Sequence, residues 1–160
     1  CARGGWWPRV RRVAPPHRVI YTLDTNVLVD ALRQPAELDR FKTFLSWALP
    51  STVLSSVVAA ELTAGARTEK ARAILDDAVL APFERRGRIV APSPAAWRRM
   101  GGLMAQLGAA GSTASRQNDV LLAVQSREHG WIVVTRDQDL KRLRSHVSGL
   151  QVGAPYPVRP

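Results

Sequence analysis

Short apolar runs alternate with segments of helical periodicity along most of this 160-residue sequence. The runs are rich in β-branched residues, which favour strands, and the segments between them carry apolar residues at helical spacing. Strands that are joined through helices pair in parallel within one sheet. The sequence therefore predicts a layered α/β fold with a mostly parallel sheet. We expect its strands at residues 19–23, 52–55, 88–91, 131–134 and 150–152.

Proline and hydroxyl residues mark the ends of the expected helices. Pro35 opens the second helix and Pro50 ends it, because proline is tolerated in the first helical turn and breaks a helix interior. Ser56 is the expected N-cap of the third helix, and Thr135 is the expected start of the last. The predicted helices span residues 27–32, 35–49, 57–66, 68–83, 94–107, 116–129 and 135–144.

Length and composition indicate one ordinary globular domain. The chain is 46% hydrophobic, yet it has no apolar run near the roughly 20 residues that a membrane helix needs, so no membrane span is expected. The one cysteine, Cys1, excludes an intramolecular disulfide. A reducing compartment, the cytoplasm, is therefore the expected location.

The charge balance indicates a polyanionic partner. The net charge of +10 fits binding to nucleic acid or to an acidic protein. Residues 1–18 are rich in arginine and proline and lack strand or helix periodicity, so we expect a flexible basic arm, followed by a folded domain over residues 19–160. The arm either contacts nucleic acid, with Trp6 and Trp7 stacking on bases, or is a passive extension.

Four of the 13 carboxylates lie where they can share one site. Asp24 directly follows the first strand and Asp137 follows the strongest one, and the carboxyl ends of parallel strands meet at the same edge of a sheet. Glu61 and Asp119 share helical faces with apolar residues. Buried carboxylates are costly unless they are paired, protonated or bound to a metal.

This chemistry fits metal-assisted cleavage of a phosphodiester. Carboxylate oxygens bind Mg²⁺ or Mn²⁺, and the metal activates water and neutralises charge on the phosphate. Basic residues outside the cluster would guide the nucleic-acid backbone, although a solvated basic helix explains them equally well. The candidates are Arg116, Arg136, Lys141, Arg142 and Arg144.

The four carboxylates stand in four short motifs, LDTNVL, SSVVAAEL followed by Gly65, NDVLLA and VVTRDQDL. In this order, over about residues 19–152, they resemble PIN-domain ribonucleases of the VapC toxin branch. The resemblance implies a three-layer PIN-like fold and Mg²⁺- or Mn²⁺-dependent hydrolysis of RNA by metal-activated water. It also implies a homodimer and a cognate antitoxin. It assigns metal binding and catalysis to Asp24, Glu61, Asp119 and Asp137, with supporting roles for Thr25, Asn26, Asn118, Thr135 and Asp139.

Each acidic residue also has a structural explanation. Asp24 is a potential helix N-cap, Glu61 has Arg67 as a potential ion-pair partner, and Asp119 suits a helix N-terminus. For Asp137, Thr135 and Gln138 form a potential capping box, and Asp139 is an alternative fourth acidic ligand, because the final motif ends in Asp-Leu where the family has Asp-Phe.

Other functions compete with the toxin interpretation. One is a PIN nuclease of general RNA processing, and another is a PIN module that binds RNA or a partner without catalysis. The sequence has no Gly-rich phosphate-binding loop, which argues against an NTPase. Ser55 and Ser56 have no plausible His-Asp partner, which argues against a serine hydrolase.

Overall fold

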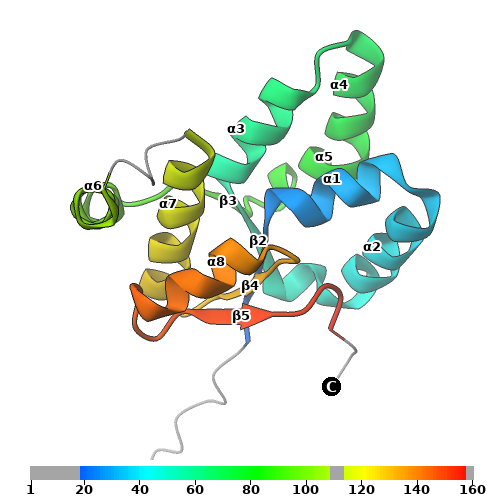
Figure 1. Ribbon diagram of the computed structural model, residues 1–160. Helices are drawn as coiled ribbons and strands as arrows, with labels where there is room; N and C mark the ends of the chain where they lie inside the picture. Colours follow the sequence, from blue (N-terminus) through cyan, green and yellow to red (C-terminus); the bar gives the residue numbers. More distant parts are fainter. Residues whose placement is uncertain (1–18, 109–113, 158–160) are drawn as a thin grey trace, which may run out of the picture.

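The structure is a computed structural model that describes residues 19–108 and 114–157, so the expected basic arm lies outside the described residues. Its centre is a sheet of five parallel strands, in the order β3-β2-β1-β4-β5 (Figure 1). The predicted layered α/β fold with a parallel sheet is confirmed. The strands are β1 (Tyr21–Leu23), β2 (Thr52–Ser55), β3 (Ile89–Val90), β4 (Ile132–Val134) and β5 (Gln151–Gly153).

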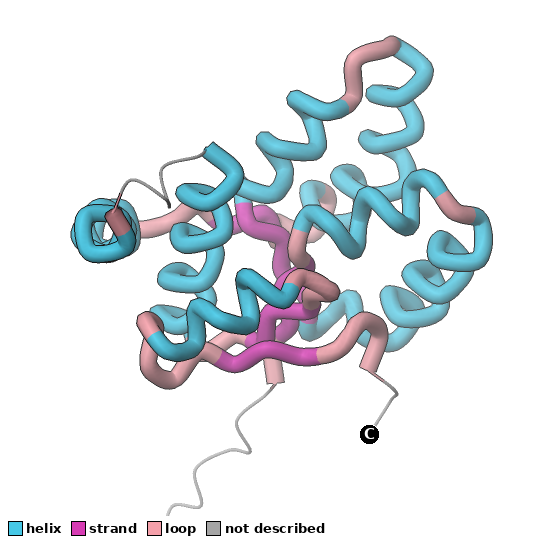
Figure 2. The backbone as a smooth tube through the Cα atoms, viewed as in Figure 1, coloured by secondary structure: helices cyan, strands magenta, loops and turns pink. Residues whose placement is uncertain are grey.

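Helices cover both faces of the sheet, as Figures 1 and 2 show. Connections between parallel strands are right-handed, so a change in the direction of travel along the sheet moves the helices to the other face. One layer contains α1 (Thr25–Arg33), α2 (Pro35–Ala48), α3 (Ser56–Gly65), α4 (Glu69–Leu75) and α5 (Ala81–Glu84). The other contains α6 (Pro94–Leu107), α7 (Ala114–His129) and α8 (Gln138–Arg142).

The strand order reverses between β1 and β4. The chain moves from β1 outward to β2 and β3, and then crosses back to β4 on the other side of β1. Leu23 of β1 pairs with Val134 of β4, and the N–H of the next residue, Asp24, donates to the carbonyl of Val134 at 3.1 Å. Ligands of open parallel sheets bind in the crevice at such a reversal, outside the carboxyl ends of the strands.

The core lies on both faces of the sheet and includes most of the expected apolar residues. Phe44 packs edge-on against Tyr21 and Trp47, with ring centroids 5.7 and 5.4 Å apart. Two expected core residues are largely exposed, Ile74 at 46% and Trp97 at 51%. Within the described ranges, no helix is long and apolar enough to cross a membrane.

Two expected helix starts and one expected long helix are corrected by the structure. The N-cap of α3 is Ser55, whose hydroxyl accepts from the N–H of Val57 at 3.2 Å, so Ser56 is already helical. The N-cap of α8 is Asp137, and Thr135 is drawn away by side-chain contacts described below. The long helix expected over residues 68–83 is divided into α4, a π-helical segment (Asp76–Leu80) and α5. Pro82 is the second residue after that segment and has no N–H to continue a regular ladder.

A buried glutamine connects helix α7 to the sheet. Gln125 of α7 is fully buried, and its Oε1 accepts a hydrogen bond from the hydroxyl of Ser55 at 2.7 Å. Its Nε2 donates to the carbonyl of Val90 at 3.1 Å. The side chain therefore joins α7 to the carboxyl ends of β2 and β3, the edge of the sheet at which the acidic residues lie.

We predict that Gln125→Ala destabilises the fold by about 2–4 kcal/mol, because it leaves a cavity and removes the partners of two buried polar groups. Chemical denaturation measures this change as a shift in the free energy of unfolding. Gln117→Ala is the matched control, since Gln117 is exposed on the same helix. Equal stability of the two variants would contradict a role for Gln125 in joining α7 to the sheet.

Candidate active site

Asp24 is the most buried member of the acidic cluster, at 4% exposure. It is the N-cap of α1, and its Oδ1 accepts from the N–H of Thr25 at 2.7 Å. Its Oδ2 accepts from Nδ2 of Asn26 at 2.7 Å and from the hydroxyl of Thr135 at 2.6 Å. Capping and membership of the cluster, which the sequence presents as alternatives, are therefore both properties of this residue.

Glu61 is held between α1 and α7. Its Oε2 accepts from the hydroxyl of Thr25, and its Oε1 accepts from Nδ2 of Asn118 at 2.8 Å. Within the described residues, these side chains are its hydrogen-bond donors, in place of the alternative partner Arg67. Thr25 and Asn118, both expected to support the cluster, thus orient this carboxylate.

Asp119 is half-buried on α7, next to Asn118 and one turn after Arg116. Burial, together with the charges of Asp24, Asp137 and Glu61, raises the pKa of its carboxyl from 3.8 to about 7, and burial is the largest cause. The nearby guanidinium of Arg116 opposes this shift. Asp119 therefore resists ionisation in the folded protein when no cation is present.

Asp137, rather than Asp139, acts electrostatically on the other carboxylates. Burial raises the pKa of Asp24 above its usual range, and the charges of Asp137 and Glu61 add to this, while hydrogen bonds from Thr135 and Thr25 oppose it. Asp139 is exposed and pairs with Arg142 at 2.8 Å. Its N–H donates to Oδ1 of Asp137 at 2.7 Å, so Asp139 meets the cluster through its backbone.

Thr135 joins the ends of β1 and β4. Besides donating to Asp24, its hydroxyl oxygen accepts from Nδ2 of Asn26 at 3.1 Å and from the N–H of Asp137 at 2.9 Å. These contacts correct the expected capping box, because the cap of α8 is the side chain of Asp137, while the hydroxyl of Thr135 binds Asp24, Asn26 and the N–H of Asp137. The sequence signal for this role of Thr135 was its position directly after the strand at 131–134. Its partner Asp24 is distant in the sequence, so local patterns could not identify the contact.

The donor set fits a hard divalent cation. In the part of the chain that the structure describes, no three carboxylate, imidazole or thiol groups lie close enough together to ligate one ion directly. The charges of Asp137 and Glu61 nevertheless raise the pKa values of Asp24 and Asp119, so a cation would relieve a repulsion that the fold maintains. Mg²⁺ is typically bound through one or two carboxylates, with water completing its shell.

A family model, described as the PIN domain, matches residues 21–145. The chain belongs to the PIN-domain family. This is a family of nucleases, and its general property is metal-dependent ribonuclease activity. The four motifs identified in the sequence lie within or overlap the matched region. No curated protein sequence is significantly similar to the chain.

Solved structures with the same fold include toxin–antitoxin complexes. VapBC2 from Rickettsia felis, bound to a DNA fragment from its promoter, is 24% identical, with a TM-score of 0.61 over 85% of this chain and 98% of that one. DNA-bound VapBC from Salmonella typhimurium is 20% identical, with a TM-score of 0.63 over 85% and 98%. FitAcB from Neisseria gonorrhoeae is 23% identical, with a TM-score of 0.60 over 87% and 100%. At these identities the likeness establishes the fold.

The basic residues expected to guide RNA are scattered over this PIN domain. Arg116 is half-buried beside Asp119, whereas Arg136 and Arg142 form ion pairs with carboxylates. Arg144 lines a depression with Tyr21 and Ile132, which begin β1 and β4, so it lies toward the amino ends of the strands. Arg116 is the candidate whose charge acts on the acidic cluster, through Asp119.

We predict that the metal-free protein loses stability as the pH rises through the pKa of Asp119. The pKa is about 7 in the folded protein and 3.8 for an ordinary aspartate, so the folded state holds the proton more tightly and is favoured at low pH. With a chelator present, the free energy of unfolding of wild type should fall between pH 5 and pH 8, and in Asp119→Asn this fall should be smaller by about 1–2 kcal/mol. The difference is modest because the carboxyl is only half-buried and solvent screens part of its interactions.

Urea denaturation at several pH values measures this effect. Asp77→Asn is the control, because Asp77 is exposed on the π-helical segment. It should keep the wild-type dependence on pH. An unchanged pH dependence in Asp119→Asn would show that the repulsion within the cluster is not a property of the protein in solution.

Proposed function

We propose that this PIN domain is a metal-dependent endoribonuclease and the toxin of a type II toxin–antitoxin pair, acting in the cytoplasm. The observation that carries the proposal is the cluster of Asp24, Glu61, Asp119 and Asp137 at the strand-order reversal, where burial and the neighbouring charges raise the pKa values of Asp24 and Asp119. RNA fits as the substrate because the chain is strongly basic and the family cleaves RNA.

The residues proposed to hold the cation are Asp24 and Asp119, together with Glu61 and Asp137. Mg²⁺ or Mn²⁺ is the proposed cofactor, and when bound it supplies a Lewis acid that activates water for attack on the phosphodiester. Hydrogen bonds keep the acidic oxygens in place, because Thr135 and Asn26 orient Asp24 while Thr25 and Asn118 orient Glu61. Such preorganisation avoids reorientation during the reaction.

We predict that the purified protein cleaves RNA in Mg²⁺ or Mn²⁺ and that a chelator stops the cleavage. Asp24→Asn and Asp119→Asn should each reduce kcat/KM about 100-fold or more, equivalent to about 2.7 kcal/mol of transition-state stabilisation. Gel or fluorescence assays on structured RNA with single-stranded loops measure these rates.

Asp139→Asn is the matched control for this experiment. Asp139 is exposed and paired with Arg142, so its loss should change the rate less than about threefold. Equal cleavage by wild type and both cluster variants would overturn the proposed site. Tight RNA binding without cleavage by the wild type would instead favour the non-catalytic PIN module.

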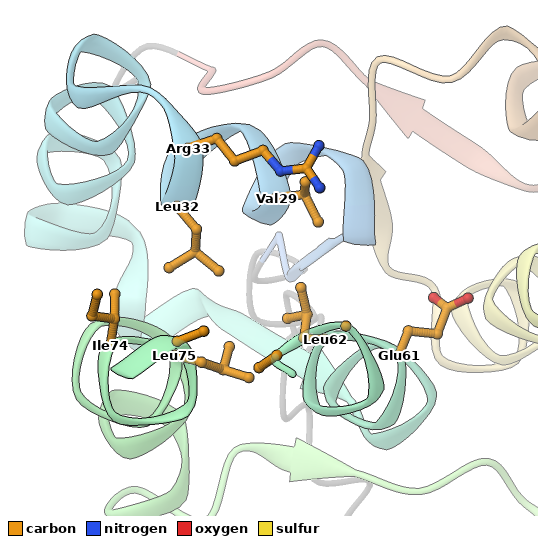
Figure 3. Close-up of a pocket in the computed structure, with 10 residues that line it drawn as sticks. Val29, Leu32, Arg33, Glu61, Leu62, Ile74 and Leu75 are labelled. Atoms are coloured by element: carbon orange, nitrogen blue, oxygen red, sulfur yellow. The ribbon is translucent and has the colours of Figure 1, made fainter. Parts of the chain in front are cut away.

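An apolar groove next to Glu61 is the proposed antitoxin site. It has a volume of about 260 Å³ and lies between α1, α3 and α4 (Figure 3). Its walls include Leu32, Leu62 and the exposed Ile74, and Glu61 lies at one end. An apolar segment of an acidic antitoxin fits this groove, because the chain carries a net charge of +10. Occupation of the groove would cover the approach to Glu61.

The other side of Glu61 is the proposed surface for homodimerisation. A second depression, of about 410 Å³, is lined by Glu61, Asn118 and Trp97, together with small and apolar residues of α3. Trp97 is 51% exposed there. A second copy of the chain would bury this ring and bring the two acidic clusters near one another.

We predict that expression of the chain arrests bacterial growth and that Asp24→Asn abolishes the arrest. Co-expression of the small protein encoded beside its gene should restore growth. Ile74→Asp should keep the toxicity but prevent the rescue, because a carboxylate would enter the apolar groove. Growth curves and co-purification measure both effects. Ribonuclease activity without toxicity would favour the alternative, a PIN nuclease of general RNA processing.

A further inference from the structure

Arg136 forms two ion pairs, with a carboxylate on α1 and a carboxylate on α2. Its Nε lies 3.2 Å from Oδ2 of Asp30 on α1, and its Nη2 contacts Oε2 of Glu37 on α2. Glu37 also pairs with Arg40 at 2.9 Å, and its side chain is only 15% exposed. The guanidinium thus joins two helices that the chain completes before it reaches β2.

The position of Arg136 in the chain gives these ion pairs a direct connection to the cluster. It stands between Thr135, whose hydroxyl donates to Asp24, and Asp137, the N-cap of α8. Its own N–H donates to Oδ1 of Asn26 at 3.3 Å, and Nδ2 of Asn26 donates to Asp24. Thr135 and Asp137 thus act on the cluster, through a hydrogen bond and through charge, while the guanidinium between them contacts α1 and α2.

The charge of Arg136 is already balanced in the folded protein. Two carboxylates accept its guanidinium, and a fork-shaped donor suits such double pairing. A phosphate would have to compete with both of them. Arg142 differs, since its ion pair with Asp139 is exposed and lies within one helical turn.

We propose that Arg136 is a positioning residue. Its ion pairs with Asp30 and Glu37 hold the loop in which Thr135 and Asp137 contact the acidic cluster. The inference rests on the proposed metal-dependent nuclease function. It replaces the direct contact with RNA that the sequence suggests for this arginine. Residues that orient metal ligands typically contribute 10–100-fold to metal affinity or activity.

Mn²⁺ binding in the absence of RNA is the first test. Electron paramagnetic resonance of free Mn²⁺ should give a Kd about tenfold higher for Arg136→Gln than for wild type. Glu37→Gln should raise the Kd in the same direction. The double variant should be no worse than Arg136→Gln alone, because both substitutions break the same ion pair. Arg136→Lys should recover part of the affinity, because an ammonium keeps the charge but lacks the fork.

Steady-state cleavage of RNA is the second test. Arg136→Gln should lower kcat about 10–100-fold while KM changes less than about threefold. A direct phosphate contact would instead raise KM and reduce the salt slope of RNA affinity by about 0.7. It would also leave Glu37→Gln without effect on kcat.

Arg85→Gln is the matched control, because Arg85 is exposed at the end of α5, and it should behave as wild type. Thermal unfolding of each variant identifies any that fail to fold, and Glu37→Gln and Arg136→Lys then carry the test.

The outcomes separate this inference from the proposed function. If wild type neither binds Mn²⁺ nor cleaves RNA, the nuclease proposal fails and the role of Arg136 fails with it. If wild type does both and the Arg136 and Glu37 variants keep its Mn²⁺ affinity and kcat, only the role of Arg136 is overturned.

Discussion

The hydrogen bond from the hydroxyl of Thr135 to Oδ2 of Asp24 joins the two strands at which the sheet reverses its order. It is buried, so it is stronger than an exposed bond and its loss would leave a desolvated carboxylate. The same hydroxyl accepts from Asn26 and from the N–H of Asp137. Residues from the first and last motifs thus become one unit, to which α3 and α7 add Glu61 and Asp119.

The burial of neighbouring carboxylates, which the proposed function needs, lowers the stability of the fold. The hydrogen bond from the neutral hydroxyl of Thr135 lowers the pKa of Asp24, which offsets part of the cost of burying this carboxylate. No such offset is evident for Asp119, since its neighbouring carboxylates add to the effect of burial and only Arg116 opposes them. A cation would reduce this loss of stability, because it attracts every carboxylate that now repels its neighbours.

Elements with strong local signals could be predicted from the sequence, whereas contacts between distant residues could not. The strand at residues 52–55 follows from its β-branched residues, and the helix that begins at Pro94 follows from its Ser-Pro signal. The N-caps of α3 and α8 were displaced by one and two residues because Ser55 and Thr135 have partners on other elements. The partners of Arg136 are about a hundred residues earlier in the chain, so local patterns left it as one basic residue among several.

Glu61 is the point at which partners would act on catalysis. It lines both the groove between α1 and α4 and the depression beside Trp97, while its oxygens are held by Thr25 and Asn118. A polypeptide in either hollow would therefore contact a residue of the cluster itself. Regulation at these surfaces then needs no long-range change, because a small local displacement of α3 would move Glu61 relative to Asp24 and Asp119. Inhibition and assembly would act on the same carboxylate from opposite sides.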